Sequence, residues 1–197
     1  LVAPGRIEVE FSDIDLLKED VLVRPTHLSI CHADQRYFQG LRATDILKQK
    51  LPMALIHEAI GEIVWDPKGE FEAGERVVMI PNTPMEEDSV IAENYLRTSK
   101  FRASGFDGFM QDVVNMRRDR IVRVPRNINP FVAAFTELVS VSVHAIDRFD
   151  KIAHERRKTV GIWGDGNLGY ITAIFFKAMF PEVKLCIFGL DENKLSD

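Results

Sequence analysis

The chain has 197 residues, of which 46% are hydrophobic and 28% charged, with a formal net charge of −5. These values are typical of a globular protein with one large domain or one and a half ordinary ones. The acidic balance gives no reason to expect nucleic acid or an anionic membrane as a partner. No apolar run is long enough to span a bilayer, and Cys31 and Cys186 are too far apart to suggest a disulfide framework. We therefore expect a protein of the reducing cytoplasm.

The first half of the chain is predicted to be rich in β-strands. Short β-branched runs, bounded by residues that break regular structure, indicate strands at 21–25, 59–64, 76–81, 109–114 and 121–124. Residues 82–106 are polar and have no strong hydrophobic period, so they predict a long excursion, with a helix favoured at 89–97.

The second half changes to a helical period. Asn129 and Pro130 are the residue types of an N-cap and a first helical position, and apolar residues follow at helical spacing as far as Ala145. A buried type of strand at 159–163 then leads into a glycine-rich turn, a helix at 168–180 and a second strand at 184–188. Strand, glycine turn, helix and strand form the context that a dinucleotide-binding fingerprint requires.

The fingerprint predicts the cofactor-binding residues. They are Gly164, Gly166, Asn167, Leu168 and Gly169, with Gly189 further on. The glycines let the backbone approach a pyrophosphate at the N-terminus of the following helix. A ribose-binding acid is expected about 20 residues later, where Gly189 stands, while Asp191 lies slightly beyond. A glycine there removes a like-charge conflict with a 2′-phosphate, which favours NADP(H) over NAD(H). A short shift of the loop would instead bring in Asp191.

Three side chains are candidate metal ligands that local structure does not explain. They are Cys31, His57 and Glu137. A thiolate, an imidazole and a carboxylate leave one position open, as in a catalytic zinc site. Each has an alternative interpretation: a small buried hydrophobe for Cys31, a core histidine for His57 and the solvent edge of a helix for Glu137. A Lewis acid together with a hydride carrier indicates carbonyl and alcohol redox chemistry.

Glu58 directly follows His57. Adjacent side chains point to opposite faces of a strand, or about a third of a turn apart on a helix. We therefore expect one of the two to bind the metal and the other to lie beside it or to bind transiently. Asp34 is expected to accept a hydrogen bond from the far nitrogen of His57.

Taken in order, the motifs resemble the zinc-dependent medium-chain dehydrogenase/reductases, the alcohol and polyol dehydrogenase family. The stretches that carry the resemblance are 31–34, 52–61, 74–77, 105–109, 136–138 and 164–169. The resemblance implies an α/β fold with a β-barrel. A GroES-like zinc catalytic domain is expected at 1–128. A connecting helix and the first βαβ part of a Rossmann NAD(P)-binding domain are expected at 129–197. A Rossmann sheet has about six strands, so the chain is expected to be truncated, and the isolated piece inactive or incompletely folded.

The resemblance also implies the site and the activity. Cys31, His57, Glu58 and Glu137 are the expected catalytic and metal-binding residues, holding one catalytic zinc beside NADP(H). Runs 28–37 and 163–169 are similar to a branch that reduces D-ribulose 5-phosphate to D-ribitol 5-phosphate for teichoic-acid and capsule precursors. A sugar-phosphate substrate, a homo-oligomer and a cytidylyltransferase of the same pathway are the implied partners. For the substrate phosphate, Arg36 is the candidate, and Arg42, Lys48 and Lys50 are interpreted as a solvated face.

Some residues depart from the family pattern. Ile56 replaces the usual Gly before the His-Glu pair, and Ala33 replaces the Ser or Thr that relays the proton, so metal-bound water or Glu58 must deliver it. The four-cysteine structural lobe is absent from 82–106. The alternatives are a general zinc-dependent polyol or alcohol dehydrogenase, a zinc-free reductase of the superfamily, and a non-catalytic protein that retains the fold.

Overall fold

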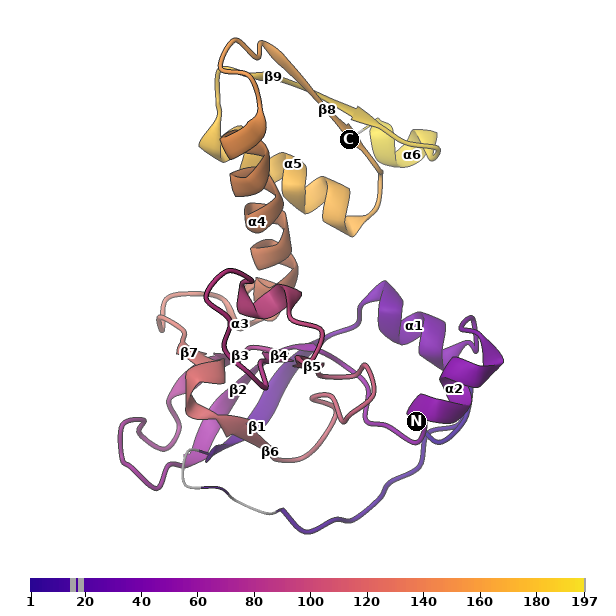
Figure 1. The fold of residues 1–197 in the computed structure, drawn as a ribbon, viewed down its shortest axis with the longest axis vertical. Coiled ribbons are helices and arrows are strands. Elements are labelled where there is room, and N and C mark those ends of the chain that lie inside the picture. Colours follow the sequence, from indigo (N-terminus) through magenta and orange to yellow (C-terminus); the bar gives the residue numbers. More distant parts are fainter. Residues whose placement is uncertain (15–16, 18–19, 197) are drawn as a thin grey trace. The chain divides into compact units, whose positions relative to one another are not determined.

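The computed structural model describes residues 1–14, 17 and 20–196. The chain forms two compact units, Leu1–Glu137 and Leu138–Asp197, which are traced in Figure 1. The division falls inside helix α4 (Thr136–Ile152), whereas the sequence analysis places the domain boundary before Asn129.

The first unit is built on a curled five-stranded sheet with the order β6-β1-β2-β3-β7. All its neighbouring strands pair antiparallel. The strands are β1 (Asp20–Ser29), β2 (Glu58–Trp65), β3 (Arg76–Met79), β6 (Val114–Arg117) and β7 (Ile121–Arg123). The strands predicted at 21–25, 59–64, 76–81 and 121–124 are confirmed. The end of β1 and the start of β2 pair side by side, Ser29 opposite Glu58, so the sheet brings residues after β1 close to residues before β2.

The segments between the sheet strands differ more from the prediction than the strands do. The strand predicted at 109–114 is wrong, because β6 begins only at Val114 and the preceding residues bond to a loop. The excursion at 82–106 holds a two-stranded ribbon, β4 (Asn82–Thr83) with β5 (Lys100–Phe101). In place of the helix predicted at 89–97 there is one 3-10 turn, η1 (Glu93–Tyr95). The sequence analysis missed three short helices and a 3-10 turn: α1 (His32–Phe38), α2 (Thr44–Lys50), α6 (Glu192–Leu195) and η2 (Arg118–Arg120).

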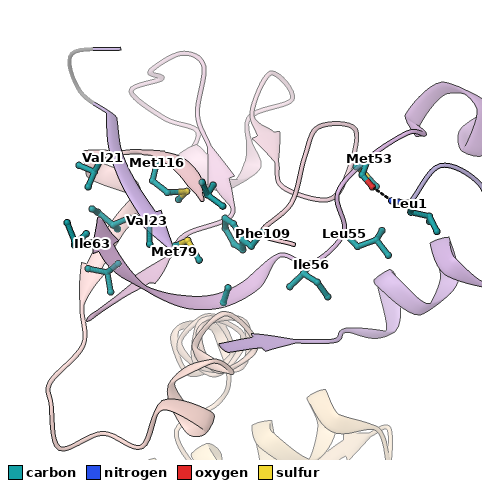
Figure 2. Close-up of a cluster of buried hydrophobic side chains, with 14 of the residues drawn as sticks. Leu1, Val21, Val23, Met53, Leu55, Ile56, Ile63, Met79, Phe109 and Met116 are labelled. Carbon is teal, nitrogen blue, oxygen red and sulfur yellow. Dashed lines mark hydrogen bonds between the residues drawn. The ribbon is translucent and has the colours of Figure 1, made fainter. Parts of the chain in front are cut away.

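The core of the first unit lies on one face of the sheet. Val21 and Val23 of β1 alternate into it, as strand geometry requires, and each buried aliphatic side chain contributes about 1.5–3 kcal/mol. Figure 2 shows Phe109 between this sheet-derived group and the loop residues Leu55 and Ile56. The core therefore extends from the sheet to the loop that precedes β2.

The second unit contains the predicted strand–helix–strand unit. Strands β8 (Thr159–Trp163) and β9 (Lys184–Phe188) pair parallel, and helix α5 (Asn167–Met179) connects them, which is a βαβ arrangement.

The helix predicted from Asn129 begins as expected, with the Asn129 side chain accepting the Phe131 N–H at 2.9 Å. It ends after one turn as α3 (Pro130–Ala133), however, and α4 starts separately. Within the described residues, no helix has the length and apolar character to cross a membrane.

Candidate metal centre and nucleotide-binding turn

Three of the four predicted metal ligands come together in the first unit. Cys31 lies just after β1, His57 just before β2, and Glu58 is the first residue of β2. Their ligand atoms all lie within 4.8 Å of one another. Nε2 of His57 is 3.9 Å from Oε1 of Glu58, and only 7% of His57 and 1% of Glu58 are exposed. Thiolate, imidazole and carboxylate are the donors that zinc takes in proteins, so the residues fit the metal that the family implies.

The expected divergence of His57 and Glu58 is not observed. Ile56, just before them, has a φ of +74°. The left-handed conformation costs an ordinary residue about 1–2 kcal/mol, and for a β-branched residue it is an outlier. Strand alternation therefore begins only at Glu58, and the chain turns immediately before His57. Ile56 keeps the backbone that the family's usual glycine would adopt without strain.

Asp34 connects the two ligand-bearing segments. Its carboxylate, 2% exposed, accepts the N–H of Cys31 at 3.0 Å and the N–H of Ile56 at 2.9 Å. Nδ1 of His57 lies 3.9 Å from the Asp34 carboxylate, which is too long for a hydrogen bond. The predicted hydrogen bond between these side chains is thus not formed in this structure, and Asp34 holds the backbone on both sides instead.

A second support comes from residues 107–110, which we call the 107–110 strap. Three of its N–H groups donate to the carbonyls of residues 54–56: those of Gly108 (2.8 Å), Phe109 (2.6 Å) and Met110 (3.0 Å). In return, the Asp107 carboxylate accepts the N–H of Ala54 at 2.7 Å. The ring of Phe101 lies 5.4 Å from the His57 ring. Sequence reasoning missed this support, although the two glycines around Phe106-Asp107 were a signal for it.

Glu137, at the start of α4, is not part of the 4.8 Å group found among the described residues. Burial, and then the charge of Glu58, raise the pKa of Glu137 to about 7. Burial also raises the pKa of the Cys31 thiol, and Glu58 adds to this effect. A bound divalent cation would favour the ionised form of each of these groups. The region around Glu58 therefore concentrates acidic groups in the way that a cation site does.

The cationic candidates for a substrate phosphate contact their own surroundings. Arg36 donates to the Leu41 carbonyl at 3.3 Å. Arg42 stacks over the Tyr37 ring at 4.9 Å, and Nζ of Lys50 lies 3.0 Å from the Ser104 hydroxyl. Lys48 is in the last turn of α2. These contacts do not assign any of the four to the metal cluster.

In the second unit, the glycine fingerprint forms the turn that it predicts. The N–H of Gly164 donates to the Phe188 carbonyl at 2.8 Å, which ties the end of β8 to the end of β9. Gly166 is the N-cap of α5, and Asn167, Leu168 and Gly169 form its first turn. The free N–H groups of such a turn are the ones that bind a pyrophosphate.

The end of β9 bears on the choice of cofactor. A Cβ added at Gly189 would collide with the Asp165 side chain, so only glycine fits. The Asp165 carboxylate accepts the N–H groups of Leu190 and Asp191, both at 2.7 Å, and these bonds lower its pKa. A carboxylate therefore lies beside Gly189, bound to two backbone N–H groups of the loop after β9, and the preference for NADP(H) stays a prediction. Asp191 itself caps α6, accepting the Asn193 N–H at 3.1 Å.

Comparison with known proteins agrees with this fold. Residues 17–126 match the sequence model of the alcohol dehydrogenase GroES-like domain, and the chain belongs to this family.

Within this family, the chain is similar to curated proteins named ribulose-5-phosphate reductase. The chain is 55% identical over 195 residues to the ribulose-5-phosphate reductase of Bacillus spizizenii W23, covering 99% of this chain and 57% of the relative. It is also 55% identical to ribulose-5-phosphate reductase 1 of Staphylococcus aureus, covering 100% of this chain and 58% of the relative. The chain thus spans a little over half the length of these curated relatives.

The chain also superposes on solved structures. The crystal structure of S. aureus TarJ in complex with NADPH superposes with a TM-score of 0.80 at 47% identity, covering 100% of this chain and 54% of that one. Galactitol-1-phosphate dehydrogenase from Escherichia coli superposes with a TM-score of 0.78 at 20% identity, covering 98% of this chain and 55% of that one. At that identity the second match shows the fold alone.

Proposed function

We propose that the parent protein is a zinc-dependent, NADPH-linked reductase that converts D-ribulose 5-phosphate to D-ribitol 5-phosphate for teichoic-acid or capsule precursors. The proposed catalytic part is residues 1–128, and the nucleotide-binding part begins at 129. The observation that carries the proposal is the cluster of a half-buried Cys31 with the buried His57 and Glu58. The 55% identity to reductases with this named activity supports the choice of substrate.

The proposed metal-binding set is Cys31, His57, Glu58 and Glu137. When bound, zinc supplies a Lewis acid that polarises the ketone oxygen. Cys31 and His57 hold it from two segments that Asp34 ties together. Because Ala33 carries no hydroxyl, we assign proton delivery to Glu58, the buried carboxylate beside His57, acting as a transient ligand.

Metal analysis of the full-length parent tests this site. Replacing Cys31 by Ser should remove zinc and activity together, because the thiolate donor is lost. The matched control, Cys186→Ser, changes the other cysteine, which lies in β9, and should keep both. Full activity after thorough chelation of the wild-type enzyme would contradict the proposal.

A substrate panel tests the reaction. Ribulose 5-phosphate should be reduced far faster than unphosphorylated ribulose, xylulose 5-phosphate or simple ketones. Arg36→Ala should raise KM for ribulose 5-phosphate if Arg36 contacts the phosphate, and the panel with this variant checks that assignment. Equal turnover of ribulose with and without its phosphate would favour a general polyol dehydrogenase instead.

For the cofactor, we propose NADP(H) over NAD(H). The support is the NADPH complex of TarJ, which is 47% identical to this chain. Asp165 and Asp191 at the end of β9 oppose a 2′-phosphate, while Lys194, 3.4 Å from the Asp191 carboxylate, is a cation at the same place. Comparison of kcat/KM for NADPH and NADH in the full-length enzyme is the test, and a clear preference for NADH would promote Asp191 as the ribose ligand.

Two further proposals rest on the family resemblance. The parent is proposed to be a homo-oligomer that associates with a cytidylyltransferase of the same pathway, and light scattering of the parent, alone and with that enzyme, tests both. We also propose the reducing cytoplasm as its location, because a thiolate ligand at Cys31 must stay reduced. Fractionation of the source cells checks the location.

A further inference from the structure

The metal cluster depends on a strained residue that offers no ligand. Building on the metal site proposed above, we propose that the left-handed backbone of Ile56 is the positioning element of this centre. Asp34 and Gly108 are the residues that hold Ile56 in that conformation. All three are positioning residues, since they act through His57 and Cys31.

Hydrogen bonds hold the backbone on both sides of Ile56. Its N–H is bound by the Asp34 carboxylate at 2.9 Å, and its carbonyl accepts the Phe109 N–H at 2.6 Å. The other oxygen of Asp34 binds the Cys31 N–H at 3.0 Å. One buried side chain therefore fixes the backbone at Cys31 and the backbone one residue before His57.

The 107–110 strap approaches the backbone of residues 54–56 closely at Gly108. A Cβ added at Gly108 would lie well inside 3.0 Å of the carbonyl oxygens of Leu55 and Ile56. Any side chain at position 108 would therefore push the strap away from residues 54–56. Glycine at 108 is what lets Phe109 reach the Ile56 carbonyl.

The side chain of Ile56 stabilises the strained position that it occupies. Its side chain is 5% exposed and belongs to the core that includes Phe109 and Tyr37. Burial of the side chain offsets the strain of the backbone, and such strain persists only where the surroundings impose it. The turn at Ile56 directs His57 toward Glu58 and Cys31, where regular strand geometry would send His57 and Glu58 apart.

The experiment measures metal affinity in the full chain, independently of turnover. Zn²⁺ dissociation constants come from competition with a chelator, and the thiolate-to-metal absorption of the Co²⁺-loaded protein reports the geometry around Cys31. Gly108→Ala and Asp34→Asn should each weaken Zn²⁺ binding by about 10–100-fold, the usual effect of losing a residue that orients a ligand, and should alter the Co²⁺ spectrum. Ile56→Gly alone is the reference for the double variant described next. Because glycine adopts the left-handed conformation freely, this variant should lose less Zn²⁺ affinity than Asp34→Asn.

The double variant Asp34→Asn with Ile56→Gly separates backbone positioning from a direct effect of Asp34 on the His57 ring. In Asp34→Asn, Ile56 is expected to leave the left-handed conformation, which β-branched residues disfavour. Glycine at position 56 has no such bias, so the double variant should bind Zn²⁺ about tenfold more tightly than Asp34→Asn alone. A double variant as weak as Asp34→Asn alone would overturn the inference, as would native affinity in both Gly108→Ala and Asp34→Asn. If Gly108→Ala does not fold, the two Asp34 variants still decide.

Val77→Ala is the structural control. Val77 is fully buried in β3, so its truncation should lower Tm without changing Zn²⁺ affinity. An equal loss of affinity in this control would mean general destabilisation and would overturn the inference. Wild-type protein that binds no Zn²⁺ would refute the proposed metal centre itself, whereas normal wild-type binding with unaffected variants would refute only the positioning role.

Discussion

Asp66 gives a quantitative test of how the first unit is held together. It directly follows β2, and its carboxylate accepts hydrogen bonds from both terminal nitrogens of Arg118. It also accepts three backbone N–H groups of the following turn: those of Lys68 (2.9 Å), Glu70 (2.8 Å) and Phe71 (2.9 Å). The side chain of Asp66 is 0% exposed and that of Arg118 is 12% exposed. The pair therefore links β2 to η2, with little of either side chain in contact with solvent.

The substitution Asp66→Asn should lower the free energy of unfolding by about 3 kcal/mol at neutral pH. Removing one partner of a buried ion pair costs about 3–5 kcal/mol, because the other charge remains desolvated. We expect the lower end of that range, since Glu70 stays 3.6 Å from Arg118 and the Asn oxygen still accepts backbone N–H groups.

The same pair predicts a pH dependence with a definite sign. The Arg118 guanidinium holds the pKa of Asp66 well below its usual range. A carboxyl group with a depressed pKa in the folded state stabilises the protein above its unfolded pKa of about 3.9, and this contribution is lost as the pH falls further toward the folded pKa. The difference between wild type and Asp66→Asn should therefore be constant above about pH 5 and shrink below about pH 4.

Urea unfolding followed by tryptophan fluorescence measures this difference. The chain has two tryptophans, so a Trp163→Phe background leaves Trp65, next to Asp66, as the reporter. Asp88→Asn is the matched control, because this exposed carboxylate also binds backbone N–H groups, those of Val90 and Ile91, and it should cost less. A loss under about 1 kcal/mol at pH 7, or a difference unchanged at about pH 3, would refute the reasoning.

Three further outcomes are expected. Ile60→Ala should cost about 2–5 kcal/mol by urea titration, because Ile60 is fully buried in β2, and a loss under about 1 kcal/mol would contradict this packing. Asp165→Asn should raise the ratio of kcat/KM for NADPH over NADH, since it keeps the size of the side chain but removes a charge at the end of β9; an unchanged ratio would place the ribose elsewhere. Zn²⁺ at about 100 times its dissociation constant should stabilise the metal-free protein by about 2.7 kcal/mol, seen as a rise in Tm that Cys31→Ser abolishes.

The sequence by itself determined the elements whose signals are local. Three of the sheet strands, the strand at Ile121 and the βαβ unit around Gly164–Gly169 follow from period, turn residues and glycine spacing over short windows. The residue types of Cys31, His57 and Glu137 also pointed to metal chemistry, since a thiolate, an imidazole and a carboxylate in a family-specific order have few other uses, and Glu58 was expected to bind or to lie beside the metal. Helices as short as α1 and α2 carry too few turns for such a signal.

Only the tertiary structure decided how the site is assembled. Sequence spacing could not place Glu58 with Cys31 and His57, because the chain turns at Ile56 with a φ that β-branched residues disfavour. It also could not show that Glu137 lies outside the 4.8 Å group formed by the other three residues. Nor could it show Asp165 at the place of a side chain on Gly189, or Asp34 binding two distant N–H groups. Each of these features joins segments far apart in the chain, and their hydrogen bonds and packing override local preference.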